Sequence, residues 1–449
     1  MAASALLVCG LGWGDEGKGS IVDYLTRRHG ARLVVRHNGG AQAAHNVVTD
    51  DGRHHTFAQF GSGTLAGAET FLSRYMLVNP IFMLAEARHL AEIGVSDPLA
   101  LVRVDRRALI TTPYHVALNR LKELARGGAR HGSCGMGIGE TVEWAAAHPH
   151  DALRAEDCFG PTPIFREKLA ALRERIWRAA RWENGGERWD RQVASEEERR
   201  ERDILTDADD AVFARTVRDY EAWAAAVRIS EPEWLAEALR ADGTVIFEGA
   251  QGVLLDQDHG FHPHTTWSDC TFGNAERLFN EAEFRGEKER IGVTRAYATR
   301  HGVGPFPTEV PGLTFAGEHN ALGPWQGAFR CGWLDLPLLR YAADACGGVD
   351  VVAVTCLDQL RGLNVRVCVD YKDWAPRATR WPVLEAQARV GNRLAEVQPV
   401  YHLLGDLATY EAVSLIEEVA GPCTIRSFGP RAADKKSTSD TRRFHAPPF

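Results

Sequence analysis

Residues 5–28, ALLVCGLGWGDEGKGSIVDYLTRR, constrain the fold more than any other stretch of the chain. An apolar run at 5–8 predicts a buried strand, five glycines between positions 10 and 19 predict a tight loop, and a helical pattern begins near Lys18. Glycines let backbone N–H groups approach an anion, and a helix N-terminus adds partial positive charge. The unit is therefore typical of a phosphate-binding site in an α/β fold.

The loop matches most of the P-loop pattern, with Gly12-x4-Gly17-Lys18, but Gly19 occupies the position where Ser or Thr would bind a metal ion. Asp15 and Glu16 place negative charge inside the loop, which is unfavourable unless a carboxylate holds a metal ion or acts as a base. A strand-to-helix turn that merely tolerates glycines is the alternative interpretation. It does not account for Lys18 and Asp15.

Composition excludes several classes of protein. The chain has 449 residues and a formal net charge of −8, which argues against general nucleic-acid binding because that function needs a basic face. No apolar run reaches the length of a membrane span, so we expect no membrane partner. The nine cysteines are scattered, odd in number and form no CxxC pair, which favours reduced thiols and a cytoplasmic protein.

Predicted strands and helices alternate along the chain, which indicates a mostly parallel α/β sheet. The strands are expected at 33–36, 99–104, 108–110, 244–248, 290–299, 349–355, 363–371 and 424–428, and the helices at 81–93, 116–126, 334–345 and 407–418. Without a repeat or a low-complexity linker, we expect one large domain over 1–433 with a helical insertion at about 160–240. The polar residues 434–449 are expected to form a disordered tail.

Three further glycine- or histidine-bearing loops are candidate sites. They are HNGGAQAAHNVV at 37–48, GGARHGSCGMGIGET at 127–141, and GAQGVLLDQDHGFHPHTTWSDCT at 249–271. In open α/β sheets, ligands bind at the loops that follow strands. The spacing of His259, His262 and His264 allows a zinc site as an alternative interpretation of the last loop.

Eight motifs, taken together and in order, resemble the adenylosuccinate synthetase family over nearly the whole chain. They are GWGDEGKG, VVRHNGGAQAAHNVV, GIGE, EGAQGVLLDQDHG, TRHGVGPFPTE, RCGWLDLPLLRYA, TCLDQL and SFGP. The resemblance implies a large, mostly parallel central sheet with a P-loop-like GTP site and helical insertions, and it implies a homodimer. It also implies a C–N ligase of purine nucleotide biosynthesis with GTP as co-substrate and Mg²⁺ as cofactor.

The reaction implied by the resemblance has two steps. GTP phosphorylates the 6-oxygen of IMP, and the amine of L-aspartate then displaces the phosphate to give adenylosuccinate. Asp15 matches the base that removes the ring N1 proton and a magnesium ligand, together with the backbone carbonyl of Ala44. His45 matches the group that acts on the transferring phosphoryl, Gln251 matches the donor to the developing 6-oxyanion, and Lys18 would neutralise phosphoryl charge.

The resemblance also implies two sets of binding residues. For GTP they are Gly14, Glu16, Gly17, Lys18, Gly19, His45, Asn46, Asp358, Ser427, Gly429 and Pro430, with Asp358 reading the guanine N1–H and N2–H. For the oxo-acceptor and the amine they are Gln42, Ser133, Cys134, Gln251, Thr266, Val303 and Arg330.

The chain departs from the family pattern mainly at substrate-recognition positions. The second loop usually reads GGHNAGHT but here reads GGAQAAHN, and Cys356 stands where a lysine would cover the base. Met136 replaces an arginine, and only Arg330 remains of several arginines that precede the CGW motif. A dicarboxylate needs fixed cationic side chains, so the groups that recognise the phosphate and aspartate are depleted.

Four explanations of these departures remain open. Other arginines, such as Arg295 or Arg300, could compensate, or the chain is a paralog that activates a different oxo-substrate or uses a different amine. A decayed scaffold is a third explanation, although decay should not spare Asp15, His45 and Gln251. A GTP-regulated binding protein is a fourth, although such a switch has no use for a ring-proton base.

Overall fold

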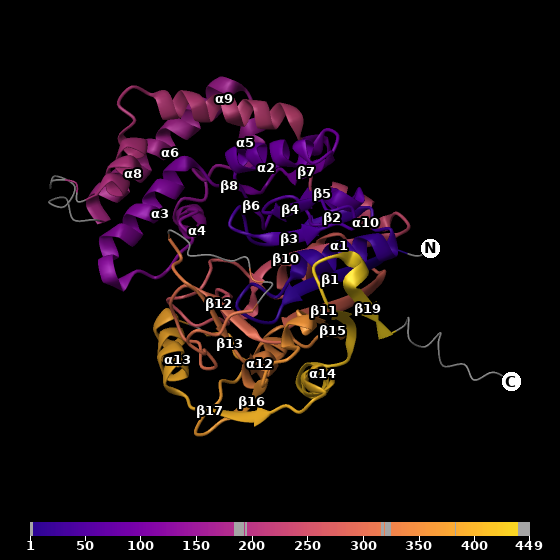
Figure 1. Cartoon of the computed structure of the whole chain (residues 1–449). Coiled ribbons are helices and arrows are strands. Elements are labelled where there is room, and N and C mark those ends of the chain that lie inside the picture. Colours follow the sequence, from indigo (N-terminus) through magenta and orange to yellow (C-terminus); the bar gives the residue numbers. More distant parts are fainter. Residues whose placement is uncertain are drawn as a thin grey trace.

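The computed structural model describes residues 3–183, 193, 195–315, 318, 325–381 and 383–438. A ten-stranded sheet runs through the centre of the chain (Figure 1). Its order is β19 (Lys435–Ser437), β18 (Cys423–Ser427), β15 (Val351–Thr355), β11 (Glu287–Arg295), β1 (Ser4–Gly10), β10 (Thr244–Gly252), β2 (Leu33–Arg36), β5 (Glu69–Leu72), β7 (Val102–Asp105) and β9 (Arg228–Ser230). Every neighbouring pair is parallel except β18 with β19, so the predicted α/β class with a mostly parallel sheet is confirmed.

Strand β1 lies between β10 and β11 and is buried on both faces. Successive side chains of a strand point to opposite faces. Accordingly, Leu7 and Cys9 join one core cluster, whereas Leu6 and Val8 join another on the opposite side. This double burial explains why the strand reads as a continuous apolar run in the sequence.

Helices cover both faces of the sheet and extend into a separate helical layer (Figure 1). They are α1 (Lys18–His29), α2 (Pro80–Glu92), α3 (Pro113–Arg126), α4 (Ile138–Ala147), α5 (Ala155–Phe159), α6 (Thr162–Glu183), α8 (Glu196–Thr206), α9 (Ala211–Ala226), α10 (Glu233–Arg240), α11 (Gly273–Glu281), α12 (Leu336–Ala345), α13 (Leu384–Glu396) and α14 (Ala408–Ala420). The start of α3 has a local cause, because Thr112 caps its N-terminus and Pro113 follows at the first helical position.

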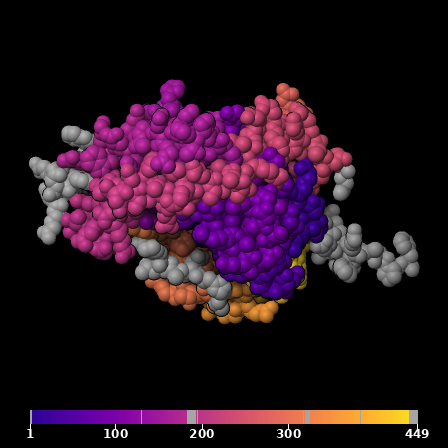
Figure 2. All heavy atoms as spheres, turned by 90° about the horizontal axis from the view of Figure 1, so that it is seen from above, coloured from indigo at the N-terminus to yellow at the C-terminus, as the bar shows by residue number. Residues whose placement is uncertain are grey.

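The predicted helical insertion at about 160–240 contains α6, α8, α9 and α10, and it also contributes β9 to the edge of the central sheet. Buried side chains of α6 and α9, including Leu169 and Tyr220, share a core cluster with Tyr114 of α3 and Met83 of α2. From above, this magenta segment lies beside the indigo N-terminal part of the chain (Figure 2). The sequence of 183–190, with Gly185 and Gly186, predicts a break between two helices, but residues 184–190 lie outside the described part of the chain.

The described residues also form four smaller sheets. Two of them are antiparallel pairs, β3 (His45–Val48) with β4 (His54–Phe57) and β12 (Ala298–His301) with β13 (Phe329–Gly332). In the third, β6 (Leu77–Val78) pairs parallel with β8 (Leu109–Ile110). The fourth has three strands, β14 (Leu334–Asp335), β16 (Arg366–Tyr371) and β17 (Pro399–Leu403), with β16 parallel to β14 and antiparallel to β17. The predicted strand at 290–299 is therefore two strands in two sheets, β11 and β12. Single turns of 3₁₀ helix lie at η1 (Thr64–Ala66), η2 (Pro98–Leu101), η3 (Gly127–Ala129), η4 (Val253–Leu255), η5 (Leu357–Leu360) and η6 (Ala432–Asp434).

The predicted start of a disordered tail at 434 is wrong. Residues Lys435–Ser437 form β19, which pairs antiparallel with β18. The stretch is polar because β19 is an edge strand, and its first residue is a buried lysine rather than an apolar side chain. Residues 439–449 lie outside the described part of the chain.

All nine cysteines lie in the described residues and are free thiols. Within the described ranges, none of the helices combines the length and the apolar character that crossing a membrane requires.

Candidate active site

The loops that follow β1, β2 and β10 meet at one edge of the central sheet, because parallel strands end on the same side. They line a cavity of about 910 Å³ together with residues of α3, α4 and the loop after Gly260. Several predicted site residues share this lining. They are Gly14, Asp15, Gln42, Ala44, His45, Ser133, Cys134, Gln251, Thr266 and Val303.

The glycine loop holds a carboxylate of its own. Glu16 accepts the backbone N–H of Gly14 at 2.6 Å and the Lys18 ammonium at 2.7 Å, and both charged side chains are buried. A Cβ on Gly10 or Gly12 would overlap the Glu16 carboxylate, which is why those positions need glycine. The Glu16 carboxylate thus binds the same kind of N–H donor and cation that a phosphate cradle presents to an anion.

His45 is oriented by a buried carboxylate. Its Nδ1 lies 2.6 Å from Oε1 of Glu248, and Ser62 donates to the same carboxylate from its backbone N–H at 2.9 Å and from its hydroxyl. Burial would raise the pKa of Glu248, but the Arg36 guanidinium and the hydrogen bonds from His45 and Ser62 outweigh burial and lower that pKa to about 2. Glu248 is therefore ionised.

Burial also lowers the pKa of His45, and Glu248 opposes that effect. The lowered pKa makes the imidazole neutral at neutral pH, with the Nδ1–H group donating to Glu248. The Nε2 atom is then left for a ligand in the cavity, which His45 lines. This is the arrangement that a residue acting on a transferring group requires.

Asp15 lies between two cationic or ionisable partners. His301 places Nε2 3.2 Å from the Asp15 carboxylate, and the Arg295 guanidinium donates to the Asp15 backbone carbonyl. Burial raises the pKa of Asp15, while His301 and Arg295 act in the opposite direction. A carboxylate whose pKa is raised accepts a proton more readily near neutral pH, which suits a general base.

Gln251 has a strained backbone at the end of β10. Its φ is 57°, in the left-handed region that a side chain rarely adopts, and its buried Oε1 has no hydrogen-bond partner among the described residues. The preceding residue, Ala250, is held on both sides by Asn38, which accepts its N–H at 2.7 Å and donates to its carbonyl at 3.0 Å. Strain of this kind is commonly stored at functional sites, and here it directs an amide to the cavity.

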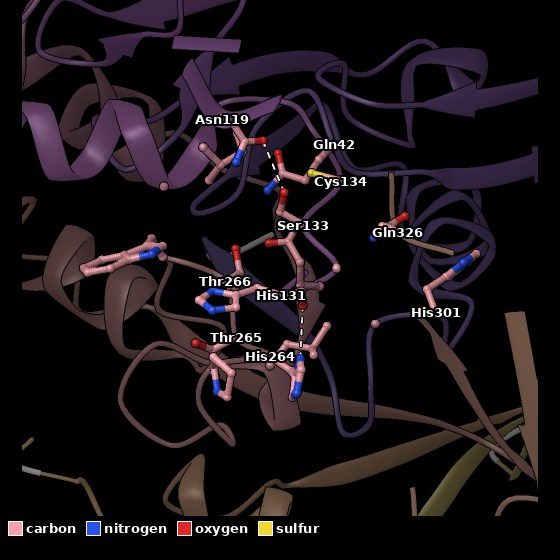
Figure 3. A pocket seen from close by; sticks show the side chains of 18 of the residues that line it. Gln42, Asn119, His131, Ser133, Cys134, His264, Thr265, Thr266, His301 and Gln326 are labelled. Carbon is pink, nitrogen blue, oxygen red and sulfur yellow. Dashed lines mark hydrogen bonds between the residues drawn. The ribbon is translucent and has the colours of Figure 1, made fainter. Parts of the chain in front are cut away.

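A second group of polar side chains forms another wall of the cavity. Figure 3 shows Gln42, Asn119, Ser133 and Cys134 close together, with Thr266 facing them. The Ser133 hydroxyl donates to Asn119 Oδ1 at 3.3 Å, whereas both amide atoms of Gln42 are buried without a partner in the described structure. Burial raises the pKa of the Cys134 thiol to about 11, so this side chain is neutral.

Arg330 and Asn46 are among the predicted contacts that do not line the cavity. Arg330 binds the Glu309 carboxylate at 2.7 Å and the Gly304 carbonyl at 3.0 Å. Asn46 is exposed on β3, where its Oδ1 accepts the Thr56 hydroxyl at 2.5 Å. Neither side chain reaches the cavity in this conformation.

The predicted nucleotide-base residues lie near the other side of the glycine loop. The Thr355 hydroxyl at the end of β15 donates to the Glu16 carbonyl at 2.6 Å, and the turn that contains Asp358 follows directly. Ser427 donates to the Gly429 carbonyl at 3.0 Å. Lys435 donates to the carbonyls of three consecutive residues, 429–431, at 3.0 Å each.

The residues present fit a magnesium ion. Asp15 and Ala44 line the same cavity, and carboxylate and carbonyl oxygens are the ligands that Mg²⁺ prefers. The zinc alternative is not supported, because the described residues contain no cluster of three His, Cys, Asp or Glu side chains that could hold a metal ion. His262 and His264 instead line the cavity, and His264 Nδ1 donates to the His131 carbonyl at 3.0 Å (Figure 3).

Three residues that the structure places at the site were missed in the sequence. Glu248 is the charged end of the apolar strand TVIFE, His301 lies two positions before Val303, and Lys435 was assigned to the tail. A carboxylate inside a buried strand was a usable signal, because such a group needs partners. The contact between His301 and Asp15 joins positions that are far apart in the chain, so no local pattern indicated it.

Comparisons with known proteins agree with this fold. Residues 7–414 match the family model described as Adenylosuccinate synthetase. The adenylosuccinate synthetase of Clostridium beijerinckii is 34% identical over 422 residues, covering 89% of this chain and 87% of the relative. That of Desulforudis audaxviator is 34% identical over 446 residues, covering 96% and 93%.

Two solved structures share the architecture. Fully ligated adenylosuccinate synthetase from Plasmodium falciparum has a TM-score of 0.73 at 22% identity, covering 96% of this chain and 99% of that chain. Cyanophage S-2L succinoaminodeoxyadenylate synthetase, bound to dGMP and to dATP as an energy donor, has a TM-score of 0.55 at 16% identity, with 99% of each chain covered. At these identities the likeness concerns the fold.

Proposed function

Because this chain belongs to the adenylosuccinate synthetase family of GTP-dependent ligases that form C–N bonds, we propose that it phosphorylates a purine 6-oxo group, which an amine then displaces. The observation that carries the proposal is the convergence of Asp15, His45 and Gln251 on one cavity beside the glycine loop. A phosphate-binding switch would need the loop but not these three side chains.

The chemistry assigns one task to each side chain. Asp15 removes the ring N1 proton, and the 6-oxygen attacks the γ-phosphorus of GTP so that GDP leaves. Gln251 donates its amide N–H to the developing 6-oxyanion, and His45 stabilises charge on the transferring phosphoryl group. The amine then attacks C6, and the C–O bond breaks with loss of inorganic phosphate.

The glycine loop and the turn after β15 form the proposed GTP site. Gly14, Gly17, Gly19 and Lys18 would contact the phosphates, which requires the Glu16 carboxylate to release the Gly14 N–H and the Lys18 ammonium. Magnesium, held by Asp15 and the Ala44 carbonyl, would neutralise phosphate charge.

The base would bind at a second part of that site. Asp358 would accept the guanine N1–H and N2–H groups, and the loop with Ser427, Gly429 and Pro430 would pack beside the base. Lys435 supports this assignment because its ammonium holds the carbonyls of that loop in place.

IMP and L-aspartate are the substrates that membership of the family favours, with Gln42, Ser133, Cys134, Thr266 and Val303 as acceptor contacts. A second candidate is a paralog that uses a different oxo-substrate or amine. The ion pair of Arg330 with Glu309 favours this second candidate. Arg330 is the one arginine left before the CGW motif, and its pairing with Glu309 makes it less available to the carboxylate of an amine substrate.

The decisive assay supplies GTP, Mg²⁺ and IMP with and without L-aspartate and measures GDP and adenylosuccinate. Rapid aspartate-dependent turnover would eliminate the second candidate, whereas turnover with another oxo-compound or amine would support it. Asp15→Ala should abolish product formation, and unchanged turnover by this variant would refute the assigned base. We also propose a homodimer, which light scattering of the purified protein would measure.

A further inference from the structure

His301 contacts the carboxylate of the proposed base. Its Nε2 atom lies 3.2 Å from Oδ2 of Asp15, and both residues line the cavity. Figure 3 labels His301 among the side chains of this lining. The contact joins the loop after β1 to the end of β12, so it is made inside the proposed active site rather than in the core.

Two permanently charged side chains near Asp15 are directed elsewhere. The Lys18 ammonium binds the Glu16 carboxylate at 2.7 Å. The Arg295 guanidinium donates to the backbone carbonyl of Asp15 and not to its carboxylate. In the described structure, the carboxylate of Asp15 is therefore met by the imidazole of His301.

The His301 ring makes no other polar contact within the described part of the chain. Its Nδ1 atom is buried without a hydrogen-bond partner there. The ring packs instead on Phe329, with the ring centroids 4.8 Å apart and the planes inclined by 59°. A buried histidine that serves the fold alone usually satisfies backbone or side-chain groups with its nitrogen atoms. The contact with Asp15 therefore points to a role in the site.

The backbone fixes His301 more firmly than it fixes Asp15. His301 ends β12 and pairs with Phe329 of β13. Gly302 follows with φ 71°, and a Cβ at that position would overlap a backbone carbonyl of the facing loop, so the chain turns directly after the histidine. Asp15 instead follows Gly14, whose φ is 112°, in a loop rich in glycine. Glycine permits more backbone conformations than other residues, so the carboxylate needs a partner that holds it.

The contact divides the two oxygens of the Asp15 carboxylate between two tasks. An imidazole nitrogen that faces a carboxylate oxygen carries the proton, so Nε2–H donates to Oδ2. The other oxygen, Oδ1, is then directed by the same hydrogen bond, because the carboxylate is planar. A general base must lie within hydrogen-bond reach of the proton that it removes.

We propose that His301 is a positioning residue, whose Nε2–H group holds Oδ2 of Asp15 so that Oδ1 faces the ring proton of the acceptor. This inference rests on the proposed function and adds to it the residue that orients the base. Because His301 acts through Asp15 and not on the GTP phosphates, its loss should lower kcat and leave the KM for GTP unchanged.

The test compares two amide substitutions of the full-length protein. The amide nitrogen of His301→Gln can reach the position of Nε2, whereas that of His301→Asn reaches only the position of Nδ1. We expect His301→Asn to lower kcat about tenfold or more, because a misplaced reacting group slows the chemical step. We expect His301→Gln to stay within about threefold of the wild-type kcat, and the KM for GTP to stay within about twofold in both variants.

The matched control is the same pair of substitutions at His402. This residue is exposed on β17 and lies outside the cavity, so neither change should alter kcat or KM. Equal losses of kcat in His301→Gln and His301→Asn would overturn the inference, since a donor at the Nε2 position would then be irrelevant. A wild-type kcat in His301→Asn would overturn it as well.

The same assay separates this inference from the proposed function. A wild-type protein that turns over no acceptor with GTP and an amine would refute the proposed function, and the inference with it. Turnover by the wild type that His301→Asn fully retains would refute the inference alone.

Nuclear magnetic resonance of protein labelled with ¹⁵N-histidine tests the contact without turnover. The His301 signals are assigned by their loss in His301→Gln. We expect Nε2 to be the protonated nitrogen and its signal to shift in Asp15→Asn. Protonation at Nδ1 alone, or no shift in Asp15→Asn, would contradict the proposed hydrogen bond.

Discussion

The carboxylate of Glu248 should control the catalytic contribution of His45. Glu248→Gln preserves the size of the side chain but removes the charge that opposes the lowering of the His45 pKa by burial. The three donors around the carboxylate are His45 Nδ1, the Ser62 N–H and the Ser62 hydroxyl. An amide cannot accept from all three, because its NH₂ group must point toward one of them.

The size of the effect follows from the contact that is lost. A hydrogen bond to a charged group contributes about 1.5–3 kcal/mol, and about 1.4 kcal/mol in the barrier is a factor of ten in rate. If the hydrogen bond between His45 and Glu248 stabilises the transition state of phosphoryl transfer by this amount, its loss should lower kcat about 10- to 150-fold. The KM for GTP should change little, because Glu248 does not line the cavity.

The assay is GTP-dependent phosphate release with an acceptor that the wild-type protein turns over. The matched control is Glu86→Gln, which neutralises another buried carboxylate that accepts the backbone N–H groups of residues 58–60. Glu86 is outside the cavity, so this variant should lower the melting temperature and retain kcat. Full activity of Glu248→Gln, or an equal loss of activity in both variants, would refute the proposed coupling.

Three further predictions concern stability and the GTP site. Burial raises the pKa of Asp335 to about 7, whereas the unfolded value is near 4. Between about pH 4 and pH 7 the folded state therefore binds more protons than the unfolded state, and the protein loses stability as the pH rises. Asp335→Asn removes this loss, so it should raise the melting temperature more at about pH 8 than at about pH 4. Gly19→Ala places a Cβ 2.8 Å from the His45 Cβ, so kcat should fall at least tenfold while far-ultraviolet circular dichroism stays unchanged. Lys435→Met removes three hydrogen bonds to residues 429–431, so the KM for GTP should rise about tenfold or more, at about 1 kcal/mol per bond.

Each of these has a result that would count against it. An Asp335→Asn gain that is the same at both pH values would mean that the carboxyl does not titrate between them. Normal kcat in Gly19→Ala would mean that the added methyl group is accommodated without disturbing the function of His45. An unchanged KM for GTP in Lys435→Met would separate the 429–431 loop from the nucleotide site.

Local patterns in the sequence were sufficient for the central part of the fold. The strand at 5–8, the glycine loop and the helix from Lys18 are in place because each depends on neighbours in the chain: buried apolar residues, glycines and a helical period. Asp15, His45 and Gln251 were assigned from the resemblance to the family, and the structure brings them to one cavity because the loops after parallel strands lie on the same side of the sheet.

Polar residues without a local pattern were assigned less well. The strand β19 was missed because its register is set by pairing with β18, and Lys435 is buried only because three carbonyls of a preceding loop surround its ammonium. Arg330 was expected at the acceptor site, but its partner, Glu309, became evident only in the folded chain.

The sequence by itself determined the α/β class, the glycine loop and the three side chains of the proposed chemistry. Only the tertiary structure decided which charges remain available in the cavity, because ion pairs such as Lys122 with Glu143 join residues of two different helices, α3 and α4. It also decided that the carboxylate of Glu16 occupies the loop and that Glu248 orients His45. Charge in a binding site is a property of neighbours in space, and most of those neighbours are distant in the chain.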